Sequence, residues 1–465
     1  MKTLFLLFLT LIVLALMPSC IEDSIDTSPS SQPEFSVDTL KMGVIFTDQP
    51  TPTHRFLVYN RHDKVMSISN ISLRSGQKIF RMNADGFSGE TFQNIEIRPN
   101  DSIFVFVEAT VPPSGTPALT PTTDYIDFTT NGVTRSILLL AEAQDVERRH
   151  GLVITEDSRW DATYPYQIFD SLVVDHGVTL TLSEGTALHF HDKAYMRIYG
   201  SLVTEGTPQN PVNLSGDRTD NVVGDISFDL MASQWDRLEF APESKGNRLS
   251  HTVIRNTSNG VIADSLSQVT FLNCRLRNSA DYSLVSRYAD VSLYGCELAE
   301  ASNGVLAIMG GKLTANHCTF ANYYLFSGLR GASVQFFHFS PDSDNESGMP
   351  YLTADFANSI FYGNGTDLSE GDFTGTDIYF NRCLFKSAGN DDDNFINSIW
   401  DTDPLYYTVR NDYYFDYRLQ PDSPARGVAD PTLTATEAAY DFYGTPRLPY
   451  PHLGAYQTDG DAGNN

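Results

Sequence analysis

The chain has 465 residues, enough for two or three domains, and 41 % of them are hydrophobic, so a sizeable core can form. The chain has 31 Lys and Arg residues and 58 Asp and Glu residues, which gives a net charge of -27. A surface that acidic repels phosphate backbones, which argues against nucleic acid as a partner. Short runs rich in Val, Ile, Thr, Phe and Tyr alternate with polar residues between Gly, Asn, Asp and Ser, and this pattern predicts an all-β protein.

The first twenty residues predict a lipoprotein leader. Lys2 supplies a positive start, and the apolar run Leu4–Met17, broken only by Thr10, is too short to span a bilayer. Leu-Met-Pro-Ser then precedes Cys20, which resembles a bacterial lipobox, where a small residue precedes the Cys that becomes the lipidated N-terminus. We therefore expect residues 1–19 to be a signal peptide and Cys20 to carry a lipid anchor, with an ordinary secretory peptide as the alternative.

Residues 20–34 are polar, contain Ser and Pro, and predict a flexible tether. Glu22 and Asp23 closely follow Cys20, and this resembles the surface-export signal of some Gram-negative lipoproteins. The resemblance implies an outer-membrane, lipid-anchored protein that is exposed at the cell surface. The periplasmic leaflet is the alternative.

Residues 35–145 predict a compact β-sandwich without cysteines. Seven short runs separated by turns fit an immunoglobulin-like architecture, namely Phe35–Phe46, His54–Asn60, Lys64–Leu73, Phe92–Arg98, Ile103–Val111, Tyr125–Thr129 and Val133–Ala141. The stretches Phe56–Asn60, Ile97–Ser102 and Asp127–Gly132 resemble the ASH/MSP-type sandwich family in their turn chemistry. That resemblance implies a spacer or interaction module and supplies no catalytic residues.

From about residue 150 the sequence repeats. Cys274, Cys296 and Cys318 are 22 residues apart, and two places after equivalent positions stand Ile254, Leu276, Leu298 and Phe320. A fixed period of this length predicts the stacked turns of a solenoid. Within each turn, apolar residues occupy every second position and then shift by one position. Because residues on one face of a strand cannot make this shift without a bend, we expect a bend at Leu272-Asn273, Tyr294-Gly295 and Asn316-His317.

Each repeat therefore contains a strand, a tight corner and a second strand. This resembles the pectin-lyase-like superfamily, which implies a right-handed parallel β-helix over residues 150–430. Equivalent residues of neighbouring turns lie about 4.8 Å apart in such a fold. We expect Cys274, Cys296 and Cys318 to stack inside it as free thiols and Cys383 to rejoin them after an insertion.

The C-terminal residues resemble the terminal cap of many secreted β-helix repeat proteins. The motifs that carry the resemblance are Asp403-Pro404-Leu405, Tyr417-Arg418-Leu419, Ser423-Pro424, Asp441 with Gly444-Thr-Pro-Arg447, and Leu453-Gly-Ala-Tyr456. His452-Leu453 and Gln457 depart from the family's Asp-Ile and final Glu. We expect residues 431–465 to form a cap and tail that cover the open strand edge of the last turn.

Motifs that mark catalysis are missing from the sequence: it has no HExxH, CxxC, GxSxG or P-loop, and none of the motifs of pectinase-like hydrolases or lyases. Arg255 and Arg277 occupy equivalent outward positions and are candidates for an anion site, against a solvated face as the simpler interpretation. Glu297 should neighbour Arg275 in an exposed salt bridge.

The separation of 41 between Cys318 and Ser359 exceeds one repeat and predicts an insertion rich in aromatic residues. Long loops on a rigid scaffold are common recognition elements, so sugar rings are candidate ligands there. A local mini-core is the alternative for these side chains. The candidate ligand-binding residues of the insertion are Tyr323, Tyr324, Phe336 and Phe337.

We expect no cofactor. Asp391-Asp392-Asp393 could hold Ca²⁺, but the run lacks the spaced ligands of a calcium loop, so a polar turn is favoured. His189 and His191 share one strand face, and two imidazoles alone make an incomplete metal site. The favoured function is a non-catalytic surface lipoprotein that presents a β-helix to polysaccharides or surface proteins. The alternative is a polysaccharide lyase or glycoside hydrolase with an unrecognised site.

Overall fold

The computed structural model describes residues 24–223, 226–339, 348–369, 371–411 and 413–457. Strands dominate these residues, and their helical content is limited to the short turns η1 (Phe228–Leu230), η2 (Pro431–Leu433) and η3 (Thr436–Ala438). Among the same residues, no helix is long and apolar enough to cross a membrane. The chain divides into an N-terminal unit, Met1–Gln144, and a β-helix unit, Asp145–Asn465. Cys20 and the leader lie outside the described residues.

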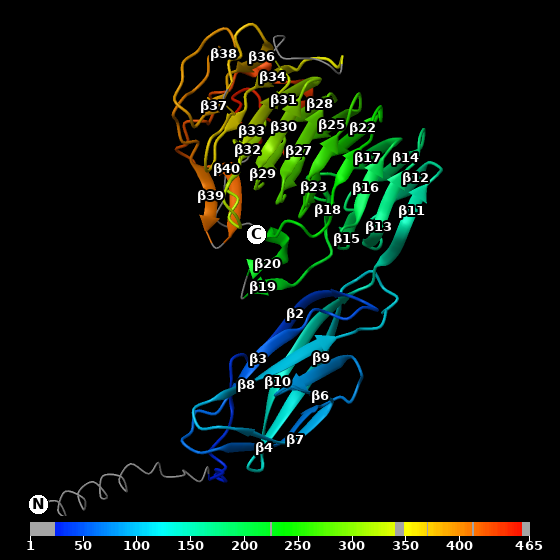
Figure 1. Ribbon diagram of the computed structural model, residues 1–465, viewed down its shortest axis with the longest axis vertical. Helices are drawn as coiled ribbons and strands as arrows, with labels where there is room; N and C mark the ends of the chain where they lie inside the picture. Colours follow the sequence, from blue (N-terminus) through cyan, green and yellow to red (C-terminus); the bar gives the residue numbers. More distant parts are fainter. Residues whose placement is uncertain (1–23, 224–225, 340–347, 370, 412, 458–465) are drawn as a thin grey trace, which may run out of the picture. The chain divides into compact units, whose positions relative to one another are not determined.

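Two five-stranded sheets build the N-terminal unit (Figure 1). One is antiparallel, with the order β1 (Glu34–Phe35), β3 (His54–Tyr59), β8 (Ser102–Ala109), β5 (Phe80–Ala84) and β6 (Phe87–Gly89). The other has the order β2 (Thr39–Phe46), β10 (Val133–Gln144), β9 (Thr120–Thr130), β4 (Met66–Leu73) and β7 (Thr91–Ile97), in which β2 and β10 are parallel. Alternating apolar residues of both sheets form one buried cluster. The immunoglobulin-like connectivity stays a prediction.

The sequence analysis missed the β5–β6 hairpin of this unit. Asp85 and Gly86 form its turn, with φ values of 49° and 84°. Asp-Gly favours such two-residue turns because both positions tolerate the left-handed backbone region. Phe80, Met82 and Ala84 also alternate as buried residues of a strand. Both signals for the hairpin were therefore present in the sequence.

Residues 24–33 make defined contacts with the N-terminal unit, while the flexibility of the tether stays a prediction. Ile25 bridges to Val65, and Ser31 is buried. Gln32 Nε2 donates to the carbonyl oxygen of Thr130 at 3.0 Å. Hydrogen bonds, rather than apolar anchors, connect this segment to the rest of the unit.

Parallel strands in three faces, sheets A, B and C, build the β-helix unit (Figure 1). Sheet A holds β12 (Ser158–Trp160), β14 (Thr179–Leu182), β17 (Ser201–Glu205), β22 (Asn247–Ser250), β25 (Gln268–Leu272), β28 (Asp290–Tyr294), β31 (Lys312–Asn316), β34 (Thr353–Ala357), β36 (Asp377–Asn381) and β38 (Phe395–Ile396). Sheet B holds β15 (Ala187–Phe190), β18 (Val212–Gly216), β23 (Thr252–Arg255), β26 (Arg275–Arg277), β29 (Glu297–Ala299), β32 (Thr319–Ala321), β35 (Ile360–Phe361) and β37 (Leu384–Phe385).

Sheet C holds β16 (Tyr195–Ile198), β21 (Leu238–Phe240), β24 (Val261–Ala263), β27 (Tyr282–Arg287), β30 (Gly304–Met309) and β33 (Val334–Phe337). Sheets B and C meet at β13 (Tyr166–Val174), which pairs with β11 (Glu147–Ile154), β15 and β16. Outside these sheets lie the hairpins β19 (Asn221–Val223) with β20 (Ile226–Ser227) and β39 (Tyr406–Asn411) with β40 (Tyr414–Leu419). From β14 to β33 the chain contributes one strand to sheet A, one to sheet B and one to sheet C in every turn, which is the arrangement of a parallel β-helix.

The register confirms the period of 22 residues. Leu249 pairs with Phe271, which pairs with Leu293, and Ile254 pairs with Leu276 in the same way. The corner between sheets A and B lies where the parity change predicted it, with φ values of 49° at Asn273, 64° at Gly295 and 52° at His317.

The interior column of thiols is also confirmed. Cys274, Cys296, Cys318 and Cys383 are all buried and free. Ile360 pairs with Leu384, so the buried Ser359 fills the place before Cys383 in this column. The thiols therefore act as small apolar fillers at the start of sheet B.

The described C-terminal residues, up to Gln457, do not close the last turn, which corrects the predicted position of this part of the cap. At that end Trp400 stacks on Phe385, with ring centroids 4.7 Å apart, and contacts Phe395. Residues 404–457, the C-terminal strap, cover the outer face of sheet B instead. A buried apolar cluster joins the two, with Ala299, Ala321, Ile360 and Leu384 from sheet B and Tyr406, Phe415, Tyr417, Leu419, Phe442, Leu453 and Tyr456 from the strap.

Candidate functional site

Arg255 and Arg277 are neighbours in the register, as predicted, but they do not form an exposed anion site. Arg255 Nη2 lies 3.2 Å from Asp229 Oδ1. Arg277 Nη2 donates to Glu297 Oε2 at 2.8 Å, and the Glu297 side chain is only 1 % exposed. Glu297 does neighbour Arg275 in the register, as predicted, but the exposed salt bridge between them is wrong: Glu297 is buried and pairs with Arg277 beneath the strap.

Tyrosines of the strap complete this buried charge cluster. Tyr456 Oη donates to Glu297 Oε2 at 2.5 Å and accepts from Arg275 Nε at 2.8 Å. Burial alone would raise the pKa of Glu297, but the Arg277 and Arg275 guanidiniums and the Tyr456 hydroxyl together lower that pKa. Groups that are paired and covered in this way hold the strap on sheet B and are closed to a ligand.

Glu300 differs from its neighbour Glu297. Its side chain accepts a hydrogen bond from Tyr417 Oη at Oε1, while Oε2 has no partner among the described residues. Burial raises the pKa of Glu300 to about 8. Arg277 lowers this pKa and the Glu297 carboxylate raises it, as smaller contributions. The carboxyl is therefore largely protonated at neutral pH.

The aromatic residues of the insertion divide between core and surface. Phe336 lies on β33 and is buried against Phe373 and Phe380, so its assignment to a projecting loop is wrong. Tyr323 packs beside Tyr417 of the strap.

Of the other two candidates, Tyr324 is half-buried and meets Phe326 edge-on at 6.0 Å. The Phe337 side chain is 41 % exposed on the outer face of sheet C. The four residues therefore do not gather into one binding surface.

The acidic and histidine motifs have structural partners. Asp391 Oδ1 accepts from Trp400 Nε1 at 3.2 Å, and Asp392 Oδ1 accepts from the backbone N–H of Asn394. His191 Nδ1 lies 2.7 Å from Asp217 Oδ2. Within the part of the chain that the structure describes, no group of three or more His, Cys, Asp or Glu side chains is placed to hold a metal ion.

A groove of about 550 Å³ lies along the corner between sheets C and A, and we call it the corner groove. Sequence analysis did not predict it. Five successive turns of the β-helix contribute to it, through Glu243, Lys245, Leu266, Ser267, Gln268, Tyr288, Ala289, Asp290, Gly311, Lys312, Pro350, Tyr351 and Thr353. The groove forms because short connections at this corner repeat with the period of the solenoid, as in Gln268, Asp290 and Lys312.

Aromatic rings form one side of the corner groove. The ring of His338 stacks on Tyr351 at 4.8 Å and meets Tyr288 edge-on at 5.6 Å. The Leu266 side chain is 48 % exposed at the next turn. An exposed apolar surface of this kind, continuous over several turns, favours contact with the apolar face of a ligand.

Charged side chains of both signs line the rest of the corner groove. Within the described residues, none of Glu243, Lys245, Asp290 and Lys312 takes part in an ion pair within 4.0 Å. Asp290 and Lys312 are register partners on adjacent turns. The groove thus offers hydrogen-bond donors and acceptors beside aromatic rings, and its charges balance in an otherwise acidic protein.

The missed signal was the polar column Gln268, Asp290 and Lys312, which has the same period as the thiols. The predicted candidates Arg255 and Arg277 belong to a different column of the same period, on sheet B.

No family model and no curated protein matches the sequence. Among the solved structures with a local match is a family 123 glycoside hydrolase from Clostridium perfringens, described for glycolipid glycan hydrolysis. It is 9 % identical, the match covers 24 % of this chain and 26 % of that enzyme, and the TM-score is 0.17. The chain thus matches about a quarter of the enzyme's length, and a likeness this small carries no argument about fold or activity.

Proposed function

We propose that the protein is a non-catalytic surface lipoprotein that binds an extended glycan in the corner groove of a right-handed, pectin-lyase-like β-helix. Its anchor is the lipid on Cys20, its place is the outer face of the outer membrane, and its N-terminal unit is an immunoglobulin-like spacer. The observation that carries the proposal is the run of aromatic and unpaired polar side chains over five turns.

The dimensions of the corner groove fit a polymer. Neighbouring turns lie about 4.8 Å apart, so five turns extend over roughly 19 Å. Its volume lies within the usual range of small-ligand sites. Tyr288 and Tyr351 supply faces for the C–H surfaces of sugar rings, while the acidic and basic groups supply acceptors and donors for hydroxyl groups.

The alternative of a lyase or hydrolase loses its main candidates, because Arg255 and Arg277 are each paired with a carboxylate. A lyase requires a free proton-abstracting base beside a group that stabilises the developing anion. Arg277 has its carboxylate partner and the strap above it, and it offers neither role.

The binding claim is tested by affinity electrophoresis of the soluble chain from residue 24 onward in gels that contain single polysaccharides. Tyr351→Ala should weaken retention about tenfold, which is the loss of roughly 1.4 kcal/mol. The matched control is Tyr379→Ala, which removes a half-buried tyrosine from β36 of sheet A, away from the groove. Equal retention of wild type and Tyr351→Ala on every retained polysaccharide would contradict the proposed site.

The anchor is tested separately, in whole cells. Labelled palmitate should enter the protein, Cys20→Ala should abolish the label, and protease added to intact cells should degrade the wild-type chain. A labelled chain that resists external protease until the cells are lysed would place it on the periplasmic side.

A further inference from the structure

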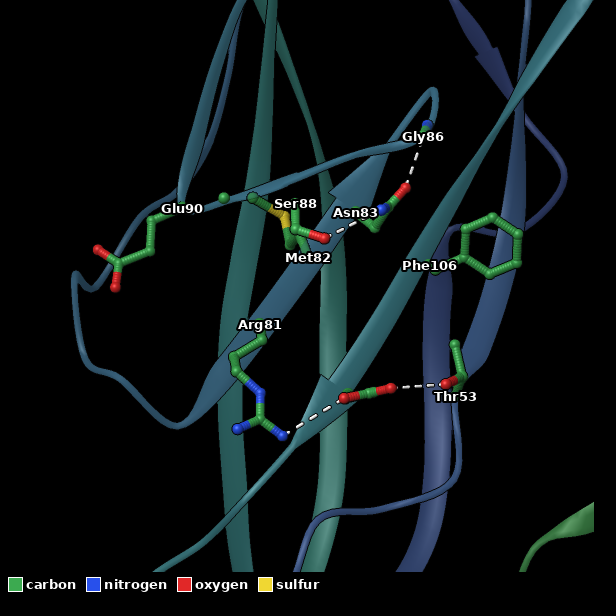
Figure 2. A pocket seen from close by; sticks show the side chains of 10 residues that line it. Thr53, Arg81, Met82, Asn83, Gly86, Ser88, Glu90 and Phe106 are labelled. Carbon is green, nitrogen blue, oxygen red and sulfur yellow. Dashed lines mark hydrogen bonds and ion pairs between the residues drawn. The ribbon is translucent and has the colours of Figure 1, made fainter.

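The N-terminal unit contains a second concavity, of about 790 Å³, on the outer face of strands β5, β6 and β8 (Figure 2). Two cross-strand pairs form its base: Asn83 lies opposite Phe106, and Arg81 lies opposite Glu108. Because side chains directly opposite in an antiparallel pair are neighbours, these four groups share one face of the sheet.

Hydrogen bonds fix the polar groups of this pocket before any ligand arrives. Glu108 Oε1 accepts from Thr53 Oγ1 at 2.6 Å, and Glu108 Oε2 accepts from Arg81 Nη2 at 3.3 Å (Figure 2). Asn83 Oδ1 accepts from the backbone N–H of Gly86. Preorganisation of this kind lowers the entropy that binding costs.

An aromatic platform lies beside these groups. The half-buried ring of Phe106 stacks with Phe104, with centroids 5.8 Å apart, and the Phe104 side chain is 43 % exposed. The guanidinium of Arg55 lies 5.3 Å from the centre of the Phe104 ring. Exposed aromatic surface next to fixed polar groups is characteristic of a recognition site.

The charges around the pocket disfavour ionic ligands. An anion would meet the carboxylates of Glu108 and Glu90, and a cation would meet Arg81. A purely apolar ligand would strip water from Asn83, Arg81 and Glu108 without replacing their hydrogen bonds. A neutral molecule with many hydroxyl groups and one apolar face can stack on the aromatic platform and also form hydrogen bonds with Asn83, Arg81 and Glu108, which we call the rim of the pocket.

An added β-strand is also a poor fit. β6 already pairs with β5 at Met82, Asn83 and Ala84, so an incoming peptide would not reach this edge of β5. β6 itself has only three residues, and a short edge strand is a weak template for pairing.

We propose that this pocket is a binding site for neutral sugars, with the ring of Phe106 as the stacking platform and Glu108, Arg81 and Asn83 as partners of the sugar hydroxyls. The site is independent of the corner groove and of the glycan proposed there. Its openness to solvent and its single platform predict affinities of about millimolar Kd for a monosaccharide.

The test is saturation-transfer NMR on the soluble chain from residue 24 onward. The probes are the methyl glycosides of glucose, galactose, mannose and N-acetylglucosamine, with glucuronate and glucosamine as charged counterparts. At least one neutral glycoside should receive saturation, strongest at the C–H groups of one ring face, and the charged sugars should receive less.

Phe106→Ala should weaken the binding about tenfold. The matched control is Phe87→Ala, which removes a phenyl ring that is 63 % exposed on the neighbouring strand and does not line the pocket. Glu108→Gln keeps the shape of the rim and should also weaken binding, so it serves as the test if Phe106→Ala does not fold. The pocket variants are also compared in a Tyr351→Ala background, so that saturation transferred from the corner groove does not mask the loss at the pocket.

Absence of saturation transfer to every neutral glycoside in the wild-type chain would overturn the proposal. So would signals that persist undiminished when Phe106→Ala or Glu108→Gln is introduced into the Tyr351→Ala background. Signals lost in Tyr351→Ala but kept in the pocket variants would assign the sugar to the corner groove and remove the second site, whatever the fate of the function proposed for the groove.

Discussion

Single residues at the corner between sheets A and B decide whether successive turns can stack. Asn273, Gly295 and His317 all adopt positive φ there, because the chain has to switch faces within one or two residues. At Gly295 the space is tighter still: a Cβ would lie 2.2 Å from Asn273 Oδ1 and 3.4 Å from Arg447 Nη2. A side chain at Gly295 would therefore add a close contact with the Asn273 amide to the strain of the backbone conformation.

Gly295→Ala should destabilise the protein by several kcal/mol, because backbone strain and a clash add together. The control is Gly177→Ala, which has a similar φ of 72° but nothing within 4 Å of the added Cβ, and which should cost only about 1–2 kcal/mol. Urea unfolding of both variants measures the difference. Equal losses would mean that packing at this corner is looser than described.

Glu300 predicts a pH dependence of stability. Its pKa is about 8 in the folded protein, against an ordinary value of 4.5. Between these pH values the folded chain keeps a proton that the unfolded chain has released, so stability falls as pH rises from about 4.5 to 8 and then levels off.

Glu300→Gln mimics the neutral carboxyl and should remove this loss. The variant should gain stability over wild type from pH 5 to about pH 8, and the gain should then level off. Melting temperatures across this range test it, with the exposed Glu437→Gln as the control whose difference from wild type stays constant. A Glu300→Gln difference that is largest at pH 5 would contradict the buried, protonated state.

At the scale of elements, the strap is the part whose placement the sequence described least well. Its motifs indicated a folded C-terminal segment, but they are turn and strand residues that do not say which surface they cover. The informative signal lay elsewhere, in outward positions of sheet B that are apolar: Ala299, Ala321, Ile360 and Leu384. Outward positions that are apolar on several neighbouring strands indicate a covered face.

The hydroxyl group of Tyr456 should contribute measurably to the docking of the strap. Tyr456→Phe removes its hydrogen bonds to Glu297 and Arg275 and should lower the free energy of unfolding by about 1.5–3 kcal/mol. Tyr443→Phe, at a half-exposed ring of the same strap, should change it by less than about 0.5 kcal/mol. Denaturant titrations compare the two, and similar losses would show that the buried cluster does not hold the strap.

The aromatic insertion shows a second limit of sequence reasoning at this scale. The separation of 41 residues between Cys318 and Ser359 suggested a long loop, yet β33 inside this segment is an ordinary strand of sheet C, with Phe336 in the core. The strand was missed because Phe336 and Phe337 occur together, so the alternation that marks a half-exposed strand is hidden.

For the whole molecule, the period of 22 residues predicted most of the β-helix unit, since each repeat specifies its own strands and corner. The spacing of the cysteines predicted the register between neighbouring turns within sheet B, and the structure agrees with it at Leu276 and Leu298. The corner groove was not predictable in the same way. It depends on Tyr288, His338 and Tyr351, which lie far apart in the sequence and meet only when turns stack.

The measurement that tests the central claim most directly is one incubation of the soluble chain with a panel of neutral and uronate-containing polysaccharides. Retention on the glycan and the appearance of new reducing or unsaturated ends are recorded together. We predict retention on at least one polysaccharide, weakened by Tyr351→Ala, with no new ends. New ends that disappear when an outward residue of the β-helix is changed would contradict the account and make the protein an enzyme.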